Sequence, residues 1–213
     1  MRKKKKFRKL RPIEQFSEEN YYTEFLGACI KHSKRDHSKY FKKYDPELPR
    51  VTAILGFLKS INPKSILDIG FGRGRLFWPI AFHMSEAKIL GIDSEYHGIE
   101  RVKKVSKEIK RIRGLCEDIT TWNVKPNRFA SEVLEHIPDV KKAIENIVLI
   151  SKKYIVGSVP SRRDSNPDHL RLLTPQILNI LFTEVCKEQD VKIKKIQFDY
   201  TLKELLFFIK LEK

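Results

Sequence analysis

Residues 65–75 read Ser-Ile-Leu-Asp-Ile-Gly-Phe-Gly-Arg-Gly-Arg, a short apolar run followed by three alternating glycines. The run Ser65–Ile69 predicts a buried β-strand, and residues 75–84 predict a helix with Pro79 in its first turn. Glycines between a strand and a helix permit positive φ angles and let the main chain approach a ligand beside the helix N-terminus. The G-x-G-x-G spacing is one residue short of the dinucleotide pattern G-x-G-x-x-G, which argues against an NAD-linked enzyme.

Acidic residues stand at three successive strand ends around this turn. Asp68 precedes the first glycine, Asp93 ends the apolar run 88–92, and Asp118 follows the weaker run 113–117. A carboxylate beside the turn suits a positively charged ligand better than a pyrophosphate. An acid at the end of the second strand accepts ribose hydroxyls in nucleotide-binding sheets, and Asp118 stands where an adenine amino group would lie. Together these acids predict a nucleoside-like ligand.

Working outward, strands and helices alternate along the remaining chain. This alternation predicts an α/β fold with a mostly parallel sheet and an antiparallel pair at its end. The predicted strands are 65–69, 88–92, 113–117, 129–131, 154–158, 191–200 and 205–211, and the predicted helices are 75–84, 98–111, 139–150 and 175–187.

The first quarter of the chain differs from the rest in its high density of basic residues. Residues 1–12 are predicted to be a basic disordered tail, residues 13–62 a helical lead-in that caps the fold, and residues 63–213 the ligand-binding domain. Residues 1–50 hold 15 Lys and Arg against 7 Asp and Glu, out of a net charge of +16 for the whole chain. Such a field attracts polyanions such as RNA, although a solvated basic tail would look the same.

Several of these segments together resemble the motifs of a known protein family. The segment Asp68-Ile-Gly-Phe-Gly-Arg-Gly74, Asp93 and Asp118 resemble motifs I, II and III of class I S-adenosylmethionine-dependent methyltransferases. Residues 131–138, Ser-Glu-Val-Leu-Glu-His-Ile-Pro, resemble the Glu-x-x-Glu-His segment that follows the fourth strand in many members. The resemblance covers about residues 50–213.

The resemblance implies a Rossmann-like sheet of seven strands, mostly parallel with an antiparallel last strand, and helices on both faces. It also implies S-adenosylmethionine as the cofactor, with Gly70 and Gly72 under its methionine moiety, Asp93 on its ribose and Asp118 on its adenine. The implied cofactor-binding residues are Asp68, Gly70, Gly72, Gly74, Asp93, Asp118 and Glu132. One departure is the short chain between Trp122 and Phe129, which leaves the fourth strand at 129–131 poorly supported.

The acceptor side centres on Glu132, Glu135 and His136, whose spacing puts them on one helical face or tight turn. Two metal-dependent branches of the family carry such a segment, the Hen-type small-RNA and the ubiquinone-pathway O-methyltransferases, and in the Hen type this segment and a distant histidine hold Mg²⁺. The corresponding set here is Glu132, Glu135, His136 and His169, with Mg²⁺ as the ion. Many relatives carry the same segment without a metal, and we take that as the default. His136, Glu135 and His169 are then the predicted catalytic residues.

The predicted function is methyl transfer to an oxygen or nitrogen of an unidentified acceptor, either RNA or an anionic small molecule. Arg162, Arg163 and Arg171 flank the expected acceptor mouth and suit a carboxylate or phosphate, although solvated loop charges would look the same. The alternative is a non-catalytic, nucleic-acid-binding scaffold. No apolar run approaches the roughly 20 residues of a membrane span, and three distant cysteines suit a reducing compartment, so we expect a cytoplasmic protein.

Overall fold

The computed structural model describes residues 48–213 except 73, 108, 123–133 and 164. The predicted basic tail (1–12), most of the helical lead-in and the predicted strand at 129–131 lie outside the described residues. Of the lead-in, the described part is one helix, α4 (Pro49–Ile61), which begins with a proline in its first turn and ends at Asn62 in a left-handed conformation.

After α4 the chain alternates between strands and helices, as the apolar runs predict. All six strands predicted within the described residues are present, with ends shifted by at most two residues. The elements are β1 (Ser65–Ile69), α5 (Phe77–His83), β2 (Lys88–Asp93), α6 (Tyr96–Val105), β3 (Ile112–Cys116), α7 (Val140–Ile150), β4 (Tyr154–Pro160), α8 (Pro175–Glu188), β5 (Lys192–Tyr200) and β6 (Glu204–Glu212).

One predicted helix is wrong in its extent: α6 runs over 96–105 and not over 98–111. The reason is Arg111, whose guanidinium donates to the main-chain oxygens of Ala81, Met84 and Ala87, the segment where α5 ends. The chain must leave the helix before Arg111 to make these contacts. The bond to Ala81 O satisfies a carbonyl group that the end of α5 leaves without a helical partner.

The described strands form two three-stranded sheets. The first has the order β1-β2-β3 and is parallel throughout, and the second has the order β4-β6-β5 and is antiparallel. The predicted hairpin at the end of the chain is therefore confirmed, with β6 paired to both β4 and β5. Seven strands in one sheet, as the resemblance implies, are not seen among the described residues, because the segment expected to supply the fourth strand lies outside them.

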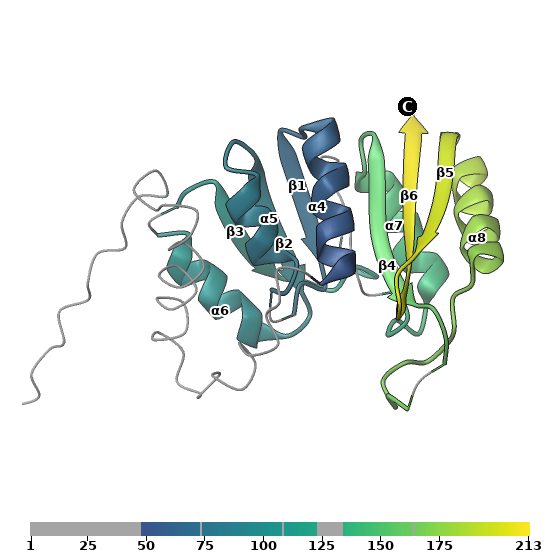
Figure 1. Ribbon diagram of the computed structural model, residues 1–213, viewed down its shortest axis with the longest axis horizontal. Coiled ribbons are helices and arrows are strands. Elements are labelled where there is room, and N and C mark those ends of the chain that lie inside the picture. Colours follow the sequence, from purple (N-terminus) through teal and green to yellow (C-terminus); the bar gives the residue numbers. More distant parts are fainter. Residues whose placement is uncertain (1–47, 73, 108, 123–133, 164) are drawn as a thin grey trace, which may run out of the picture.

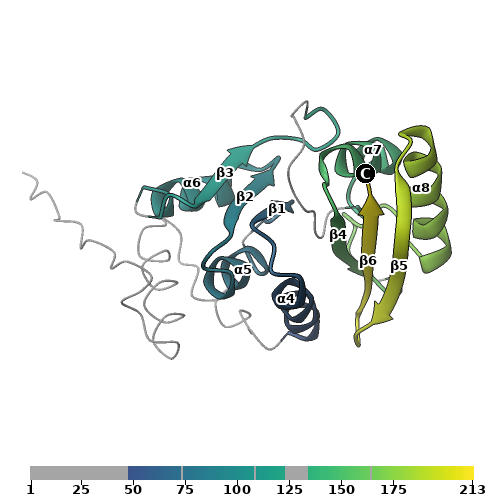
Figure 2. The ribbon, with the colours of Figure 1, turned by 90° about the horizontal axis from the view of Figure 1, so that it is seen from above.

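Helices cover both faces of these strands (Figures 1 and 2). One buried cluster joins α4, α5 and α6 to one face through Ile66, Ile89 and Ile112. The other joins α7 and α8 to the opposite face through residues of both sheets, including Ile69, Ile92 and Ile155. Because each apolar cluster contains residues from both sheets, the two sheets form the middle of one three-layered α/β unit.

The carboxyl ends of β1, β2 and β4, with the loops that follow them, lie along one edge, the lower one in Figure 1. In α/β sheets this edge is where ligands bind. Among the described residues, no helix combines the length and apolar character needed to cross a membrane.

Candidate functional site

The glycine turn after β1 has the main-chain geometry that its sequence predicts. Gly70, Gly72 and Gly74 have φ angles of 63°, 50° and 82°, all in the left-handed region that favours glycine. The Gly70 amide continues the sheet by donating to Ile92 O over 2.8 Å, and the Gly74 amide closes a turn on Phe71 O over 2.7 Å. The turn then enters α5.

Asp93 fixes this turn from the neighbouring strand. Its carboxylate accepts hydrogen bonds from the Gly72 amide at 2.6 Å and from the Glu95 amide at 2.8 Å, one on each oxygen. Asp93 is 8% exposed, so both bonds lie in a largely dry environment. Each carboxylate oxygen can accept a second bond, which leaves acceptor capacity for hydroxyl groups of a ligand.

Gly98 is a supporting residue that the sequence did not reveal. It lies in the first turn of α6, where an added Cβ would collide with the Gly72 carbonyl oxygen and lie 2.9 Å from the Phe71 ring. The absence of a side chain at this position therefore lets α6 pack directly beneath the turn. A glycine shortly after the acid at the end of β2 is the signal that could have pointed to it.

The other two predicted acids occupy different surroundings. Asp68 is buried in β1, at 2% exposure, directly before the turn. Asp118 is exposed after β3, where its Oδ1 accepts from the Thr120 amide and hydroxyl, each at 2.8 Å. Asp68, Asp93 and Asp118 thus follow the same edge of β1, β2 and β3, in the order that the sequence predicts.

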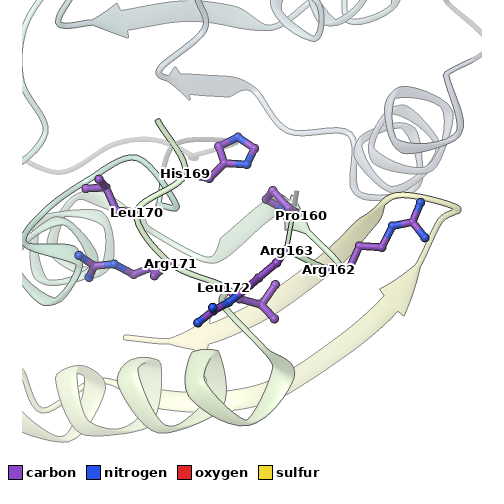
Figure 3. A pocket seen from close by; sticks show the side chains of 7 residues that line it. All are labelled: Pro160, Arg162, Arg163, His169, Leu170, Arg171 and Leu172. Carbon is purple, nitrogen blue, oxygen red and sulfur yellow. The ribbon is translucent and has the colours of Figure 1, made fainter. Parts of the chain in front are cut away.

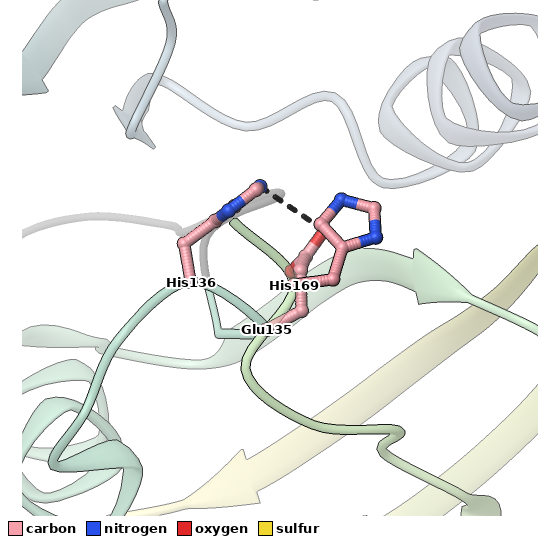
Figure 4. Close-up of side chains that lie close together, drawn as sticks. All are labelled: Glu135, His136 and His169. Atoms are coloured by element: carbon pink, nitrogen blue, oxygen red, sulfur yellow. Dashed lines mark ion pairs between the residues drawn. The ribbon is translucent and has the colours of Figure 1, made fainter. Parts of the chain in front are cut away.

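A second group of polar side chains gathers Glu135, His136 and His169 (Figure 4). One ligand-capable atom from each lies within 4.8 Å of the others. Glu135 Oε1 is 3.9 Å from His136 Nε2, and the two imidazole rings stand 4.8 Å apart at 64°. Glu135 is buried, whereas the His136 side chain is 43% exposed. All three predicted catalytic residues therefore meet, and Glu132 lies outside the described residues.

Two segments hold this cluster, and their contacts run mostly through the main chain. We call residues 135–138 and 168–171 together the clasp. His136 Nδ1 is 2.9 Å from Asp168 O, the Leu170 amide donates to Glu135 O at 3.0 Å, and Arg171 Nη2 donates to Pro138 O at 2.7 Å. Each segment then leads into a capped helix: Asp139 accepts from the Lys142 amide to start α7, and Thr174 from the Ile177 amide to start α8.

The clasp determines the tautomer of neutral His136. A carbonyl oxygen only accepts hydrogen bonds, so Nδ1 must carry the proton that it donates to Asp168 O. Nε2 then has its lone pair exposed on the side of Glu135 Oε1. A carboxylate oxygen and an imidazole nitrogen that face one another in this way can bind a cation between them.

A pocket of about 300 Å³ adjoins the cluster and shares His169 with it (Figure 3). Its wall is formed by Pro160 at the end of β4, by Arg162 and Arg163, and by residues 169–172. Arg163 extends toward Leu172, whereas Arg162 extends to the opposite side. The three arginines predicted to flank the acceptor mouth therefore line one pocket.

Comparison with known proteins agrees with this geometry at the level of the fold. No known protein family matches the sequence, and no curated protein matches it either. The methyltransferase domain of a bacterial Hen1 protein has a TM-score of 0.62 at 16% identity, over 78% of this chain and 100% of that one. Magnesium protoporphyrin IX methyltransferase from Synechocystis PCC 6803, with bound S-adenosylhomocysteine, has a TM-score of 0.59 at 12% identity, over 90% and 96% of the two chains. The chain has the fold of S-adenosylmethionine-dependent methyltransferases.

A third similar structure is larger than this chain. A proposed O-methyltransferase from Nostoc punctiforme has a TM-score of 0.58 at 14% identity, over 75% of this chain. This chain spans 55% of the length of the Nostoc protein. At such identities the likeness describes the architecture of a methyltransferase fold, and the reaction must be argued from the site itself.

Proposed function

We propose that this chain is an S-adenosylmethionine-dependent methyltransferase that transfers a methyl group to an oxygen or nitrogen atom. The proposal depends on one juxtaposition: the loop after β1, with its glycine turn bonded to Asp93, and the loop after β4, which brings His169 to Glu135 and His136, lie at the same edge of one α/β unit. Structures of the same fold that contain S-adenosylhomocysteine or S-adenosylmethionine support the choice of cofactor.

On the cofactor side, the chain's task is binding and orientation. S-adenosylmethionine, when bound, would supply a methyl group from its positively charged sulfur and would leave as S-adenosylhomocysteine. Asp93 would accept hydrogen bonds from the ribose hydroxyls with its remaining acceptor capacity, and exposed Asp118 would accept one from the adenine amino group. Buried Asp68 would place a carboxyl group directly before the turn, and Gly70, Gly72 and Gly74 carry no side chain that would obstruct a ligand.

On the acceptor side, His136 takes the proton that the acceptor atom loses as it forms its bond to carbon. The Nδ1–H bond to Asp168 O leaves Nε2 as the basic nitrogen. Glu135 Oε1, 3.9 Å away, stabilises the imidazolium that results. The clasp holds His136 in place beforehand, which is the positioning that a displacement reaction needs.

The donor set also fits a divalent cation. One carboxylate and two imidazoles are ligands for several divalent ions. Glu135, His136 and His169 would hold the ion, with Glu132 as the fourth ligand implied by the family resemblance. When bound, the ion would supply a Lewis acid that makes an acceptor hydroxyl easier to deprotonate.

Calorimetry with S-adenosylhomocysteine tests the proposal, first in EDTA and then with added Mg²⁺ or Mn²⁺. We expect micromolar binding in both conditions, followed by transfer of label from S-adenosylmethionine to an acceptor pool. A metal requirement would appear as transfer that EDTA abolishes and Mg²⁺ restores. Failure to bind in either condition would refute the enzyme, and binding without transfer to any pool would favour the scaffold alternative.

A further inference from the structure

We infer that the pocket between the end of β4 and the start of α8 binds an oxyanion, a phosphate or carboxylate, carried by the methyl acceptor. That the methyl acceptor carries this anion rests on the proposed function, whereas binding of an anion by the pocket does not. The inference adds the chemical class of the substrate to the proposed function.

The charge around the pocket is the first reason. Arg162, Arg163 and Arg171 all line a space of about 300 Å³, with Arg163 extending toward Leu172 and Arg162 toward the opposite side. Among the residues that the structure describes, no carboxylate forms an ion pair with any of these three arginines. A concave, uncompensated positive surface concentrates anions.

The donors themselves are the second reason. Arg162 and Arg163 are exposed, and no hydrogen bond to another described residue ties down either guanidinium. Arg171 is half-buried and donates one Nη2–H to Pro138 O, which leaves four of its five N–H groups to donate to a ligand. A planar guanidinium offers paired donors that match two oxygens of a phosphate or carboxylate, so this pocket favours an oxyanion over a simple halide.

The position of the pocket connects the anion to the reaction. His169 belongs both to the pocket and to the cluster, and its ring lies 4.8 Å from that of His136. An acceptor with its oxyanion against the arginines would therefore present neighbouring atoms to His136. Pro160, Leu170 and Leu172 provide apolar wall between the charges. A volume at the low end of ligand pockets suits one charged end group rather than a long polymer segment.

Inorganic phosphate, acetate and chloride at equal ionic strength and fixed pH are the probes. The full chain is titrated with each, in the presence and absence of S-adenosylhomocysteine, while NMR follows the C2 proton of His169, assigned with His169→Gln. The test variant is Arg162→Gln/Arg163→Gln, whose residues are both exposed. The matched control is Lys59→Gln/Lys88→Gln, which removes two exposed charges at the opposite edge of the sheet.

We expect a saturable shift with phosphate or acetate but not with chloride. The double arginine variant should weaken this binding by about tenfold or more, the loss expected for charge-assisted hydrogen bonds, and the lysine control should leave it unchanged. If the double arginine variant does not fold, Arg171→Lys replaces it, since lysine keeps the charge and loses the fork. No saturable shift, or equal affinities in variant and control, would overturn the inference.

The same samples separate the two proposals. Loss of S-adenosylhomocysteine binding with an intact phosphate response would refute the proposed enzyme and support the anion pocket. Normal cofactor binding without an anion response would refute the anion pocket and leave the proposed enzyme standing. Glycerol phosphate and a short oligouridylate then identify the source of the phosphate. One contact gives a shallow dependence of affinity on salt, whereas several backbone contacts give a steep one.

Discussion

The glycine turn and the clasp lie at the same edge of the molecule but are built in different ways. The turn is made of main chain, and its closing bond joins Gly72, in the turn after β1, to Asp93, 21 residues later at the end of the adjacent parallel strand β2. The clasp is made of two segments that meet through bonds spanning 32 and 33 residues, and it presents side chains. The difference indicates that the turn, which we propose as the cofactor edge, is fixed by the sheet, whereas the clasp, which we propose as the acceptor edge, is fixed by loops. A substitution that disrupts the turn should therefore leave the clasp intact, and the reverse should also hold.

The largest effect should come from removing the carboxylate that closes the turn. Asp93→Ala removes the acceptor of two amide hydrogen bonds and the predicted ribose ligand. We expect S-adenosylhomocysteine binding to weaken by roughly 1.5–3 kcal/mol, measured by calorimetry. Asp199→Ala, which removes an exposed carboxylate from β5, is the control. Unchanged affinity in Asp93→Ala would refute the role assigned to this residue.

Two helical glycines offer a matched pair of substitutions. Gly98→Ala forces a methyl group against Gly72 O and Phe71, whereas Gly56→Ala in α4 meets nothing within 4 Å. Gly98→Ala should cost about 1–3 kcal/mol of unfolding free energy and weaken cofactor binding. Gly56→Ala should stabilise the protein by about 0.5–1 kcal/mol. Denaturant unfolding and calorimetry measure both, and similar behaviour of the two variants would contradict the close packing beneath the turn.

Two cysteines allow cofactor binding to be followed chemically. Cys116 is exposed at the end of β3, directly across from Asp93 in the sheet, whereas burial raises the pKa of Cys186 to about 11. Iodoacetamide at pH 8 should therefore modify Cys116 and spare Cys186. S-adenosylhomocysteine at ten times its Kd should slow Cys116 modification about tenfold. Peptide mass spectrometry reads each cysteine separately, and an unprotected Cys116 would place the cofactor elsewhere.

The smallest change in cofactor affinity is expected from substitutions in and beside the clasp. His136→Gln and Arg163→Gln alter the acceptor edge alone, so we expect S-adenosylhomocysteine affinity to change by less than about twofold, as for independent sites. Methyl transfer in His136→Gln should fall by about 100-fold or more once an acceptor is known. A large loss of cofactor affinity in either variant would show that the two edges are coupled.

The cofactor edge could be predicted from the sequence because its information is local. Apolar runs located the strands of the described residues, the three glycines follow β1, and the three acids lie within two residues of the ends of β1, β2 and β3. The extent of α6 could not be predicted, because Arg111 bonds to main-chain oxygens of a segment about 25 residues earlier, which leave no trace in a helical pattern. Gly98 was missed for a related reason: its role depends on a neighbour in space.

The acceptor edge was predicted only as a list of residues. The spacing of Glu135 and His136 indicated a shared turn, but nothing in it indicated that residues 168–171 would bond alongside. Those bonds use the carbonyl groups of Glu135, Pro138 and Asp168, and a carbonyl group is the same in every residue type. The caps at Asp139 and Thr174 are the one readable signal, since both residue types favour helix N-termini.

The clasp also has a consequence for how this protein could be redesigned. The chain between Pro160 and Asp168 has both its ends fastened, one in the pairing of β4 with β6 and the other to His136. This stretch can be replaced by another loop, because the replacement leaves in place the pairing of β4 with β6 and the bond between Asp168 and His136. Arg162 and Arg163 lie within it and His136 does not. Under the proposed function, loops of different charge grafted between Pro160 and Asp168 should change the preference for the acceptor while His136, His169 and Arg171 stay in place.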